Sequence, residues 1–300
     1  NLANLSYSKD NGNFNIVWKV TEEEIANTSD NDKCVALITV NKPINEAILN
    51  QYKNVKAVLV AFTGYGIHDL DLCKERNISV YNVPDYSSSS VAELAIGLTL
   101  AVLREIPKGE NVLRNGGWAF SPGGNDLRGK TVGIVGTGTI GICTAKLFNA
   151  FGCKLIGWSR SERQEFKDLG GIYVSREELF STADIVSLHI PNNKETRKCI
   201  GENDFQLLKP TSILINTARG QVCDQDALVK YLVNGKFRAG LDVYAIEPLP
   251  EDDGGLRKCD NVVITPHVAY KTKEALTRRA AITANNAINA LNGDDTNRVG

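Results

Sequence analysis

The sequence predicts an α/β protein built from two Rossmann-like domains, each with a doubly wound parallel sheet. From residue 34 onward, apolar runs of strand length alternate with helix-like segments, which is typical of parallel sheets covered by helices. The alternation stops in the glycine- and proline-containing stretch RNGGWAFSPGGNDLRG and starts again at Lys130. The chain has 300 residues, which is long enough for two domains.

The first alternation predicts the smaller domain. Strands are expected at CVALITV, VKAVLVAF and ISVYNV, and helices at NEAILNQY and DLDLCKERN. The serines of PDYSSSS are able to cap the helix VAELAIGLTLAVLRE. The polar residues 1–13 are interpreted as a frayed end or the remnant of a first strand. The segment TKEALTRRAAITANNAINALNG is expected to form one long helix that returns to this domain.

The second alternation predicts a nucleotide-binding domain. Six strands are expected, at TVGIVG, KLIGWS, DIVSLHI, SILINTA, FRAGLDVY and NVVITPH, with helices at 139–151, 175–182, 202–208 and 223–234. We therefore predict a substrate domain of residues 1–94 plus 275–300 and a larger dinucleotide-binding domain of residues 95–274. The active site is expected in the cleft between them.

Composition excludes several classes of protein. The net charge is −1, whereas a nucleic-acid surface needs a basic excess. The longest apolar stretch is too short to span a bilayer, and the histidines and cysteines do not cluster as metal ligands do. The seven scattered cysteines are interpreted as free thiols in a reducing compartment. We expect a cytoplasmic protein without a metal, nucleic-acid or membrane partner.

The motif GTGTIG, residues 136–141, predicts a phosphate cradle because it follows a strand and opens a helix. Gly136 allows the tight turn, Gly138 lets the backbone approach a pyrophosphate, and Gly141 lets helix and strand pack closely. The helix N-terminus offers unpaired amides and partial positive charge to the anion. The alternative is a glycine-rich turn that holds no ligand.

The end of the next strand predicts the coenzyme. The acid that usually holds the ribose hydroxyls of NAD is replaced by Ser159, followed by Arg160. Serine and arginine can bind a 2′-phosphate that a carboxylate would repel. NADP(H) is therefore the preferred cofactor, with NAD(H) possible. In the alternative interpretation Arg160 points to solvent, and Glu162 or backbone groups hold the ribose.

Further polar residues lie at predicted strand ends, where ligands bind in such sheets. Arg219 can bind a carboxylate through two parallel hydrogen bonds, and His267 can give or take the proton when a carbonyl is reduced. Glu247 can orient the imidazole and favour its protonated form. The alternatives are a structural ion-pair arginine, a glutamate that only shapes a turn, and a satisfied core histidine.

Taken in order, the motifs GTGTIG, LHIP, LLKPTSILINTARG, GLDVYAIEP and ITPHVA resemble the D-isomer-specific 2-hydroxyacid dehydrogenases, in particular the glyoxylate and hydroxypyruvate reductases. The resemblance extends from about Cys34 to the C-terminus. It implies that Arg219 binds and polarises a keto acid, that Glu247 and His267 form the acid–base pair, and that Asp242 contacts the nicotinamide end. It also implies that the loop residues Thr63, Gly64 and Tyr65 bind the substrate carboxylate through their backbone amides. These three residues, with Arg219 and His267, are the expected substrate-binding residues.

By the motif and the resemblance together, a larger set is expected to bind the dinucleotide. Its members lie on the turns after the predicted strands: Gly136, Gly138, Thr139, Ile140, Gly141, Ser159, Arg160, Ser161, His189, Pro191, Thr196, Thr217, Ala218, Asp242, His267 and Ala269. Within this set His189 is expected to be mainly structural and outside proton transfer. His68, which follows the substrate loop, is expected to be exposed.

The expected function is NAD(P)H-dependent reduction of a small 2-keto acid, of the glyoxylate or hydroxypyruvate type, to the D-2-hydroxy acid. The enzymatic alternatives are D-lactate dehydrogenase and phosphoglycerate dehydrogenase. A non-enzymatic alternative is a nucleotide-sensing transcriptional corepressor of the same fold. The family commonly forms homodimers, and the helix and loop around residues 92–121, with Trp118, fit such an interface.

Overall fold

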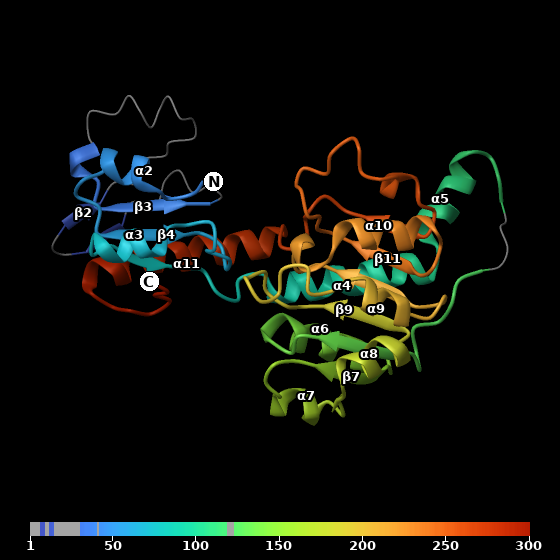
Figure 1. Ribbon diagram of the computed structural model, residues 1–300. Helices are drawn as coiled ribbons and strands as arrows, with labels where there is room; N and C mark the ends of the chain where they lie inside the picture. The colour runs from blue at the N-terminus through green and yellow to red at the C-terminus, as the bar shows by residue number, and fades with distance from the viewer. Residues whose placement is uncertain (1–6, 10–11, 15–30, 41, 119–122) are drawn as a thin grey trace. The chain divides into compact units, whose positions relative to one another are not determined.

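The computed structural model describes residues 7–9, 12–14, 31–40, 42–118 and 123–300. Backbone contacts divide the chain into a smaller unit, residues 1–86 with 273–300, and a larger unit, residues 87–272. Both units are α/β with parallel sheets, as predicted (Figure 1). Each unit is described by itself.

The smaller unit contains a three-stranded parallel sheet of order β3-β4-β5. Its strands are β3 (Ala36–Thr39), β4 (Ala57–Val60) and β5 (Ser79–Tyr81), and its helices are α2 (Glu46–Gln51), α3 (Leu70–Glu75) and α11 (Lys273–Asn292). A short 3₁₀ helix spans Asn31–Lys33. Within residues 1–14, β1 (Tyr7–Lys9) and β2 (Gly12–Phe14) form an antiparallel pair, and the rest of that stretch lies outside the described residues.

Both faces of the small sheet are buried, as a doubly wound sheet requires. Along β4, Val58 and Val60 belong to the apolar cluster that contains Leu49 of α2. Leu59, which points to the opposite face, belongs to the cluster packed against Ala287 of α11. Helix α11 therefore covers the small sheet, and the prediction that the last helix returns to the first domain is confirmed.

The larger unit contains a seven-stranded parallel sheet of order β12-β11-β10-β9-β6-β7-β8. The strands are β6 (Thr131–Val135), β7 (Lys154–Trp158), β8 (Ile172–Tyr173), β9 (Ile185–Leu188), β10 (Ile213–Asn216), β11 (Arg238–Leu241) and β12 (Val262–Ile264). The helices are α4 (Ser88–Leu103), α5 (Ile106–Arg114), α6 (Thr139–Ala150), α7 (Gln164–Asp168), α8 (Arg176–Thr182), α9 (Glu202–Leu207) and α10 (Gln225–Val233), with 3₁₀ turns at Gly220–Val222 and Leu256–Lys258.

Two apolar layers cover the large sheet. One cluster joins Leu98 of α4 and Phe148 of α6 to Ile134 of β6. The other joins helices α8, α9 and α10 to the opposite face, with Phe205 and Leu214 among its members. The strand order reverses at β6, which lies between β7 and β9. In open sheets of this kind, ligands bind outside the carboxyl ends of the strands at such a reversal.

The structure adds three elements that the sequence analysis did not predict. Strand β8 has two residues and α7 has five, so neither carries a readable periodicity. Helix α5 contains Pro107 and Gly109, both poor helix formers, and none of its residues is buried. The expected domain boundary at residues 94/95 falls inside α4, which lies wholly in the larger unit.

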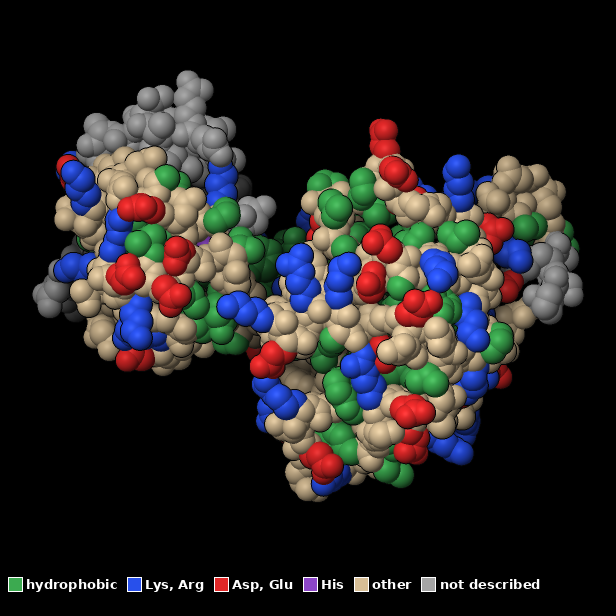
Figure 2. Space-filling view, in the orientation of Figure 1, with side chains coloured by type: hydrophobic (Ala, Val, Ile, Leu, Met, Phe, Trp, Pro, Cys, Tyr) green, Lys and Arg blue, Asp and Glu red, His purple; other side chains and the backbone are tan. Residues whose placement is uncertain are grey.

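The remaining expectations about the chain concern its thiols and its surface. None of the seven cysteines forms a disulfide, so all are thiols, as predicted. Among the described residues, no helix is long and apolar enough to cross a membrane. On the face of the larger unit that Figure 2 shows, acidic and basic side chains are interspersed.

Candidate active site

The glycine-rich turn after β6 has the backbone geometry of a phosphate cradle. Gly136 has a φ of +95°, which favours glycine, and a Cβ there would lie 2.7 Å from a backbone oxygen after β9. A Cβ on Gly141 would lie 2.0 Å from the carbonyl oxygen of Gly136. A Cβ on Gly138, the N-cap of α6, would meet nothing within 4 Å. The first amides of α6, at Thr139 and Ile140, are therefore open to an anion.

Two buried polar atoms in the segments after β9 and β10 lack partners among the described residues. They are Oγ1 of Thr217, after β10, and Nδ1 of His189, after β9. Buried polar groups are nearly always hydrogen-bonded, so unpaired ones at a strand-end crevice fit a site that receives a polar ligand. The other His189 nitrogen, Nε2, lies 2.8 Å from Oγ of Ser187. Burial lowers the pKa of His189 to about 3, so the ring is neutral.

The turn after β7 is more exposed. The Arg160 side chain is 88% exposed, and its guanidinium lies 3.6 Å from the Glu195 carboxylate. Ser159 is half-buried and Ser161 is exposed. This arrangement fits the interpretation in which Arg160 points to solvent, and a 2′-phosphate would have to compete with Glu195 for the guanidinium.

The remaining predicted cofactor residues lie on loops at the same edge of the sheet. After β9, the Thr196 hydroxyl donates to the carbonyl oxygen of Pro191 at 2.5 Å and closes a tight loop. After β10, the Ala218 amide donates to the Asn216 side chain at 3.0 Å. The Ala269 amide donates to the Asp242 carboxylate at 2.8 Å. The parallel strands thus bring these segments to one edge, as the alternation predicted.

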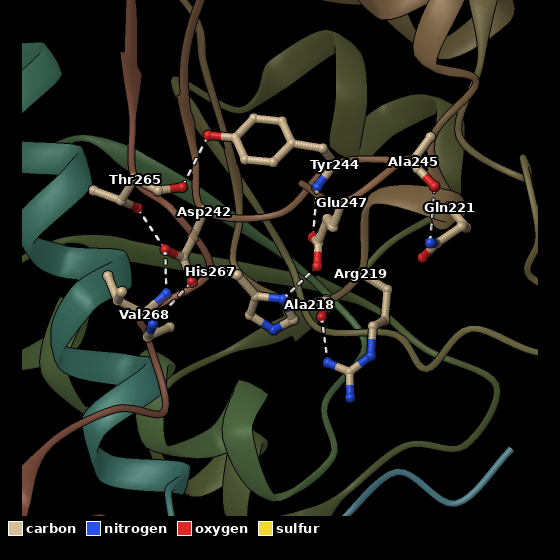
Figure 3. Close-up of polar contacts among 11 residues, drawn as sticks. Ala218, Arg219, Gln221, Asp242, Tyr244, Ala245, Glu247, Thr265, His267 and Val268 are labelled. Carbon is tan, nitrogen blue, oxygen red and sulfur yellow. Dashed lines mark hydrogen bonds and ion pairs between the residues drawn. The ribbon is translucent and has the colours of Figure 1, made fainter. Parts of the chain in front are cut away.

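Arg219, Glu247 and His267 follow β10, β11 and β12, and their side chains lie close together (Figure 3). Nδ1 of His267 lies 2.6 Å from Oε2 of Glu247. The Arg219 guanidinium donates to the carbonyl oxygen of Ala218 at 2.7 Å. The next residue, Gly220, contacts the Tyr244 backbone so closely that a Cβ would lie 1.9 Å from the Tyr244 carbonyl carbon. Only glycine lets the arginine-bearing turn approach the glutamate-bearing loop in this way.

The Glu247 carboxylate is ionised in this setting. Burial on its own raises the pKa of Glu247. The hydrogen bonds from the His267 ring and the Tyr244 amide, together with the charges of His267 and Arg219, outweigh burial and hold that pKa below its usual value. The Tyr244 amide donates to Oε1 at 2.9 Å, so both carboxylate oxygens are occupied. The carboxylate is fixed against the imidazole.

Asp242 organises the segment that bears His267. Its carboxylate is fully buried and accepts hydrogen bonds from the Thr265 hydroxyl at 2.5 Å, the Val268 amide at 2.9 Å and the Ala269 amide at 2.8 Å. The His267 amide donates to the carbonyl oxygen of Asp242 at 2.8 Å. His267 has a φ of +52°, an unusual conformation for a non-glycine residue that these bonds stabilise. The predicted contact of Asp242 with the nicotinamide stays a prediction.

Two neighbours of the candidate site, Tyr244 and Tyr270, escaped the sequence analysis. The buried Tyr244 hydroxyl donates to the carbonyl oxygen of Thr265 at 2.9 Å, and burial raises the pKa of Tyr244 to about 12. The Tyr270 ring lies edge-on to the His267 ring, with centroids 5.6 Å apart. Tyr244 and Tyr270 lie within the motifs DVYAIEP and PHVAY, next to the residues that were identified, so their position in the sequence was the available signal.

The predicted substrate loop, Thr63, Gly64 and Tyr65, follows β4 in the smaller unit. Thr63 and Gly64 are exposed, and Tyr65 is half-buried. The expectation that His68 is exposed is wrong. His68 is 7% exposed, and its Nδ1 accepts a hydrogen bond from the Ile44 amide at 3.1 Å. Burial lowers the pKa of His68, which favours the neutral ring.

A seven-stranded parallel sheet with a glycine cradle at its reversal point, and a histidine, a glutamate and an arginine at its carboxyl edge, defines a nicotinamide-dependent oxidoreductase. The chain belongs to the D-isomer specific 2-hydroxyacid dehydrogenases. The NAD binding domain of that family matches residues 96–269. The family acts on small 2-hydroxy and 2-keto acids with a pyridine nucleotide as cofactor.

Similar proteins support this assignment over most of the chain. A glyoxylate reductase of Thermofilum pendens is 37% identical over 293 residues, which cover 92% of this chain and 84% of that protein. A hydroxypyruvate reductase of Thermotoga maritima is 40% identical over 237 residues, which cover 77% and 76%. The crystal structure of a D-lactate dehydrogenase from Aquifex aeolicus, complexed with NAD and lactic acid, has a TM-score of 0.84 at 31% identity, covering 94% and 89%.

Proposed function

We propose that this enzyme reduces a short 2-keto acid of the glyoxylate or hydroxypyruvate type to the D-2-hydroxy acid. The observation that carries the proposal is the 2.6 Å contact between Nδ1 of His267 and Oε2 of Glu247, close to Arg219 (Figure 3). The glyoxylate and hydroxypyruvate reductases among the similar proteins support this substrate class.

The three side chains divide the chemistry. The Arg219 guanidinium binds the substrate carboxylate through two hydrogen bonds and polarises the neighbouring carbonyl. Because Glu247 occupies Nδ1 of His267, Nε2 carries the proton that is delivered to the carbonyl oxygen. The Glu247 carboxylate stabilises the charged imidazole until the proton leaves. By the family resemblance, we also propose that the backbone amides of the loop that contains Thr63, Gly64 and Tyr65 contribute to binding the substrate carboxylate.

The groups that would bind the cofactor lie at the carboxyl ends of the strands of the large sheet. The open turn at Gly138 and the N-terminus of α6 would hold the pyrophosphate, and the unpaired atoms of Thr217 and His189 would face the nucleotide. When bound, the nicotinamide supplies the hydride. We propose NADP(H) as the preferred form, because no carboxylate takes the place of Ser159 at the end of β7.

A rate assay tests the proposal directly. Oxidation of NADPH and of NADH would be followed by absorbance with glyoxylate, hydroxypyruvate, pyruvate and phenylpyruvate. We expect the highest kcat/KM for NADPH with one of the first two acids. A preference for pyruvate would favour D-lactate dehydrogenase, the activity named for the similar Aquifex aeolicus structure. Nucleotide binding without turnover of any keto acid would contradict the proposal and favour the corepressor.

We also propose that the protein is a homodimer. Helix α5 is amphipathic with no buried residue, and Ile106, Leu113 and Trp118 are 53%, 55% and 88% exposed. Apolar surface of this kind on and after one helix fits a protein interface. Residues 119–121 of the predicted interface segment lie outside the described residues. Light scattering after size exclusion should give twice the chain mass, and Trp118→Glu should shift the protein toward the monomer. A monomeric wild type would contradict the proposal.

A further inference from the structure

The loop after β4 is fixed at both ends. At its start, the Val83 amide donates to the carbonyl oxygen of Phe62 at 3.0 Å, and the Thr63 hydroxyl donates to the carbonyl oxygen of Val83 at 2.9 Å. At its end, Nδ1 of His68 accepts the Ile44 amide at 3.1 Å. The loop therefore has a defined position within the smaller unit.

The middle of the loop is different. The amide N–H groups of residues 64–66 have no hydrogen-bond partner within the described part of the chain. Gly64 and Gly66 are exposed, and a Cβ on Gly66 would meet nothing within 4 Å. Consecutive free amides on a fixed loop are what a backbone anion site requires.

A closed network of three asparagines connects to this loop. Nδ2 of Asn82 donates to the carbonyl oxygen of Thr63 at 2.9 Å. Nδ2 of Asn286, in α11, donates to the carbonyl oxygen of Asn82 at 2.7 Å. Nδ2 of Asn297 donates to Oδ1 of Asn286 at 2.9 Å, and the Asn82 amide donates to the carbonyl oxygen of Asn297 at 3.1 Å. The network joins the ends of β4 and β5 to α11 and to the residues that follow it.

Two asparagines of the network are buried. An apolar side chain at either position would avoid the free-energy cost of desolvating an amide group. Asn286 is 1% exposed and Asn82 is 7% exposed. Buried amides cost free energy unless they are hydrogen-bonded, and here each one is. Beyond packing, the hydrogen bonds of these amides fix the direction of the Thr63 carbonyl group.

That direction sets the next amide. The carbonyl of Thr63 and the N–H of Gly64 belong to one planar trans peptide, so they point in opposite directions. A hydrogen bond to the Thr63 oxygen therefore holds the Gly64 N–H on the far side of the peptide, and it also polarises that N–H as a donor. We propose that Asn82 and Asn286 are positioning residues that orient the Gly64 amide for the substrate carboxylate. This inference rests on the proposed function.

Isosteric substitutions test it. Asn82→Asp and Asn286→Asp each replace a donor by an acceptor with little change of shape. Each should raise the KM for the keto acid about tenfold, as expected for a weakened hydrogen bond to a charged group, while kcat changes less than about threefold. The Kd for the dinucleotide alone should not change. Asn285→Asp is the matched control, since Asn285 is an exposed neighbour in the same helix and should leave KM unchanged.

A third variant protects the test against misfolding. Asn297 has a φ of +66°, so Asn297→Gly keeps the backbone conformation and removes only the amide that donates to Asn286. It should raise KM about threefold, a smaller effect because it acts through Asn286. If both aspartate variants fail to fold, this variant decides.

The outcomes separate this inference from the proposed function. A KM rise in the network variants but not in Asn285→Asp supports it. Folded variants with the wild-type KM overturn it and leave the proposed function standing. A parallel loss of kcat, dinucleotide affinity and melting temperature also overturns it, because the network would then be only structural. A wild type that turns over no keto acid would overturn both.

Discussion

Two turns at the carboxyl edge of the same sheet are built in opposite ways. The segment after β12 is held by the fully buried Asp242 carboxylate, which accepts three hydrogen bonds, and it presents His267 to Glu247 at 2.6 Å. The turn after β7 presents Arg160, which is 88% exposed and has one 3.6 Å contact with Glu195. The difference matches the demands of the two proposed roles. Proton transfer needs fixed geometry, whereas coenzyme choice needs only a charge near the ribose.

The largest expected effect is the loss of kcat on substitution of His267, the residue that the fixed turn presents. His267→Ala removes the proposed proton donor and should lower kcat about 10³-fold, within the range usual for general acid–base catalysis. The Kd for NADPH, measured by fluorescence titration, should change less than about threefold, because the phosphate cradle lies on another strand end. A variant that keeps more than a tenth of the wild-type kcat would show that His267 is not the donor.

The next effect tests the support beneath His267. Asp242→Asn places an amide group among three donors, so one donor loses its acceptor. The free energy of unfolding should fall by about 2 kcal/mol, and kcat about tenfold. Chemical denaturation and steady-state kinetics measure the two quantities. Asp252→Asn, at an exposed aspartate, is the control and should change neither. If the Asp242 variant has wild-type stability, the turn is not held as described.

The buried ring of His189, after β9, predicts that the stability of the protein depends on pH. Burial lowers the pKa of His189 to about 3 in the folded chain, from about 6.5 in an unfolded one. Between these values the unfolded chain binds the proton and the folded chain does not, so stability falls as the pH falls. The contribution is at most about 1.4 kcal/mol per pH unit. His189→Gln should flatten the unfolding free energy between pH 6 and pH 4.5. If the unfolding free energy of His189→Gln depended on pH as steeply as that of the wild type, the conclusion that the buried His189 ring is neutral would be wrong.

The smallest effect concerns the exposed turn. If Arg160 binds the 2′-phosphate as proposed, Arg160→Ala should raise the KM for NADPH about tenfold and leave the KM for NADH unchanged, because NADH lacks that phosphate. The melting temperature should stay within about 1 °C, because exposed ion pairs contribute little to stability. Arg163→Ala, at another exposed arginine, is the control. Equal changes for both coenzymes would remove Arg160 from coenzyme selection.

Local signals in the sequence predicted much of this architecture. GTGTIG predicted the turn at residues 136–141, with the tight turn at Gly136 and the close packing at Gly141, because its meaning depends only on the adjacent strand and helix. The strand-end positions of Arg219, Glu247 and His267 were predicted for the same reason. Strand β8 was missed because two residues leave no pattern, and α5 because it lacks a buried face.

Contacts between distant segments were not predictable from the sequence. Asp242 accepts hydrogen bonds from residues more than twenty positions away, so its part in fixing the His267 turn appears only in three dimensions. His68 follows a loop and was expected to be exposed, yet it is buried and accepts a hydrogen bond from the amide of Ile44, twenty-four positions earlier. The network of Asn82, Asn286 and Asn297 spans more than two hundred positions.

The central claim is that Glu247 and His267 act as one acid–base pair in keto-acid reduction. The most direct measurement is kcat for the wild type and for Glu247→Gln, with NADPH and the preferred keto acid at saturation. Glutamine keeps the shape of the side chain but removes the charge that stabilises the protonated imidazole. We predict that kcat falls about a hundredfold with an unchanged dinucleotide Kd. Equal kcat values would show that the 2.6 Å contact plays no part in the chemistry.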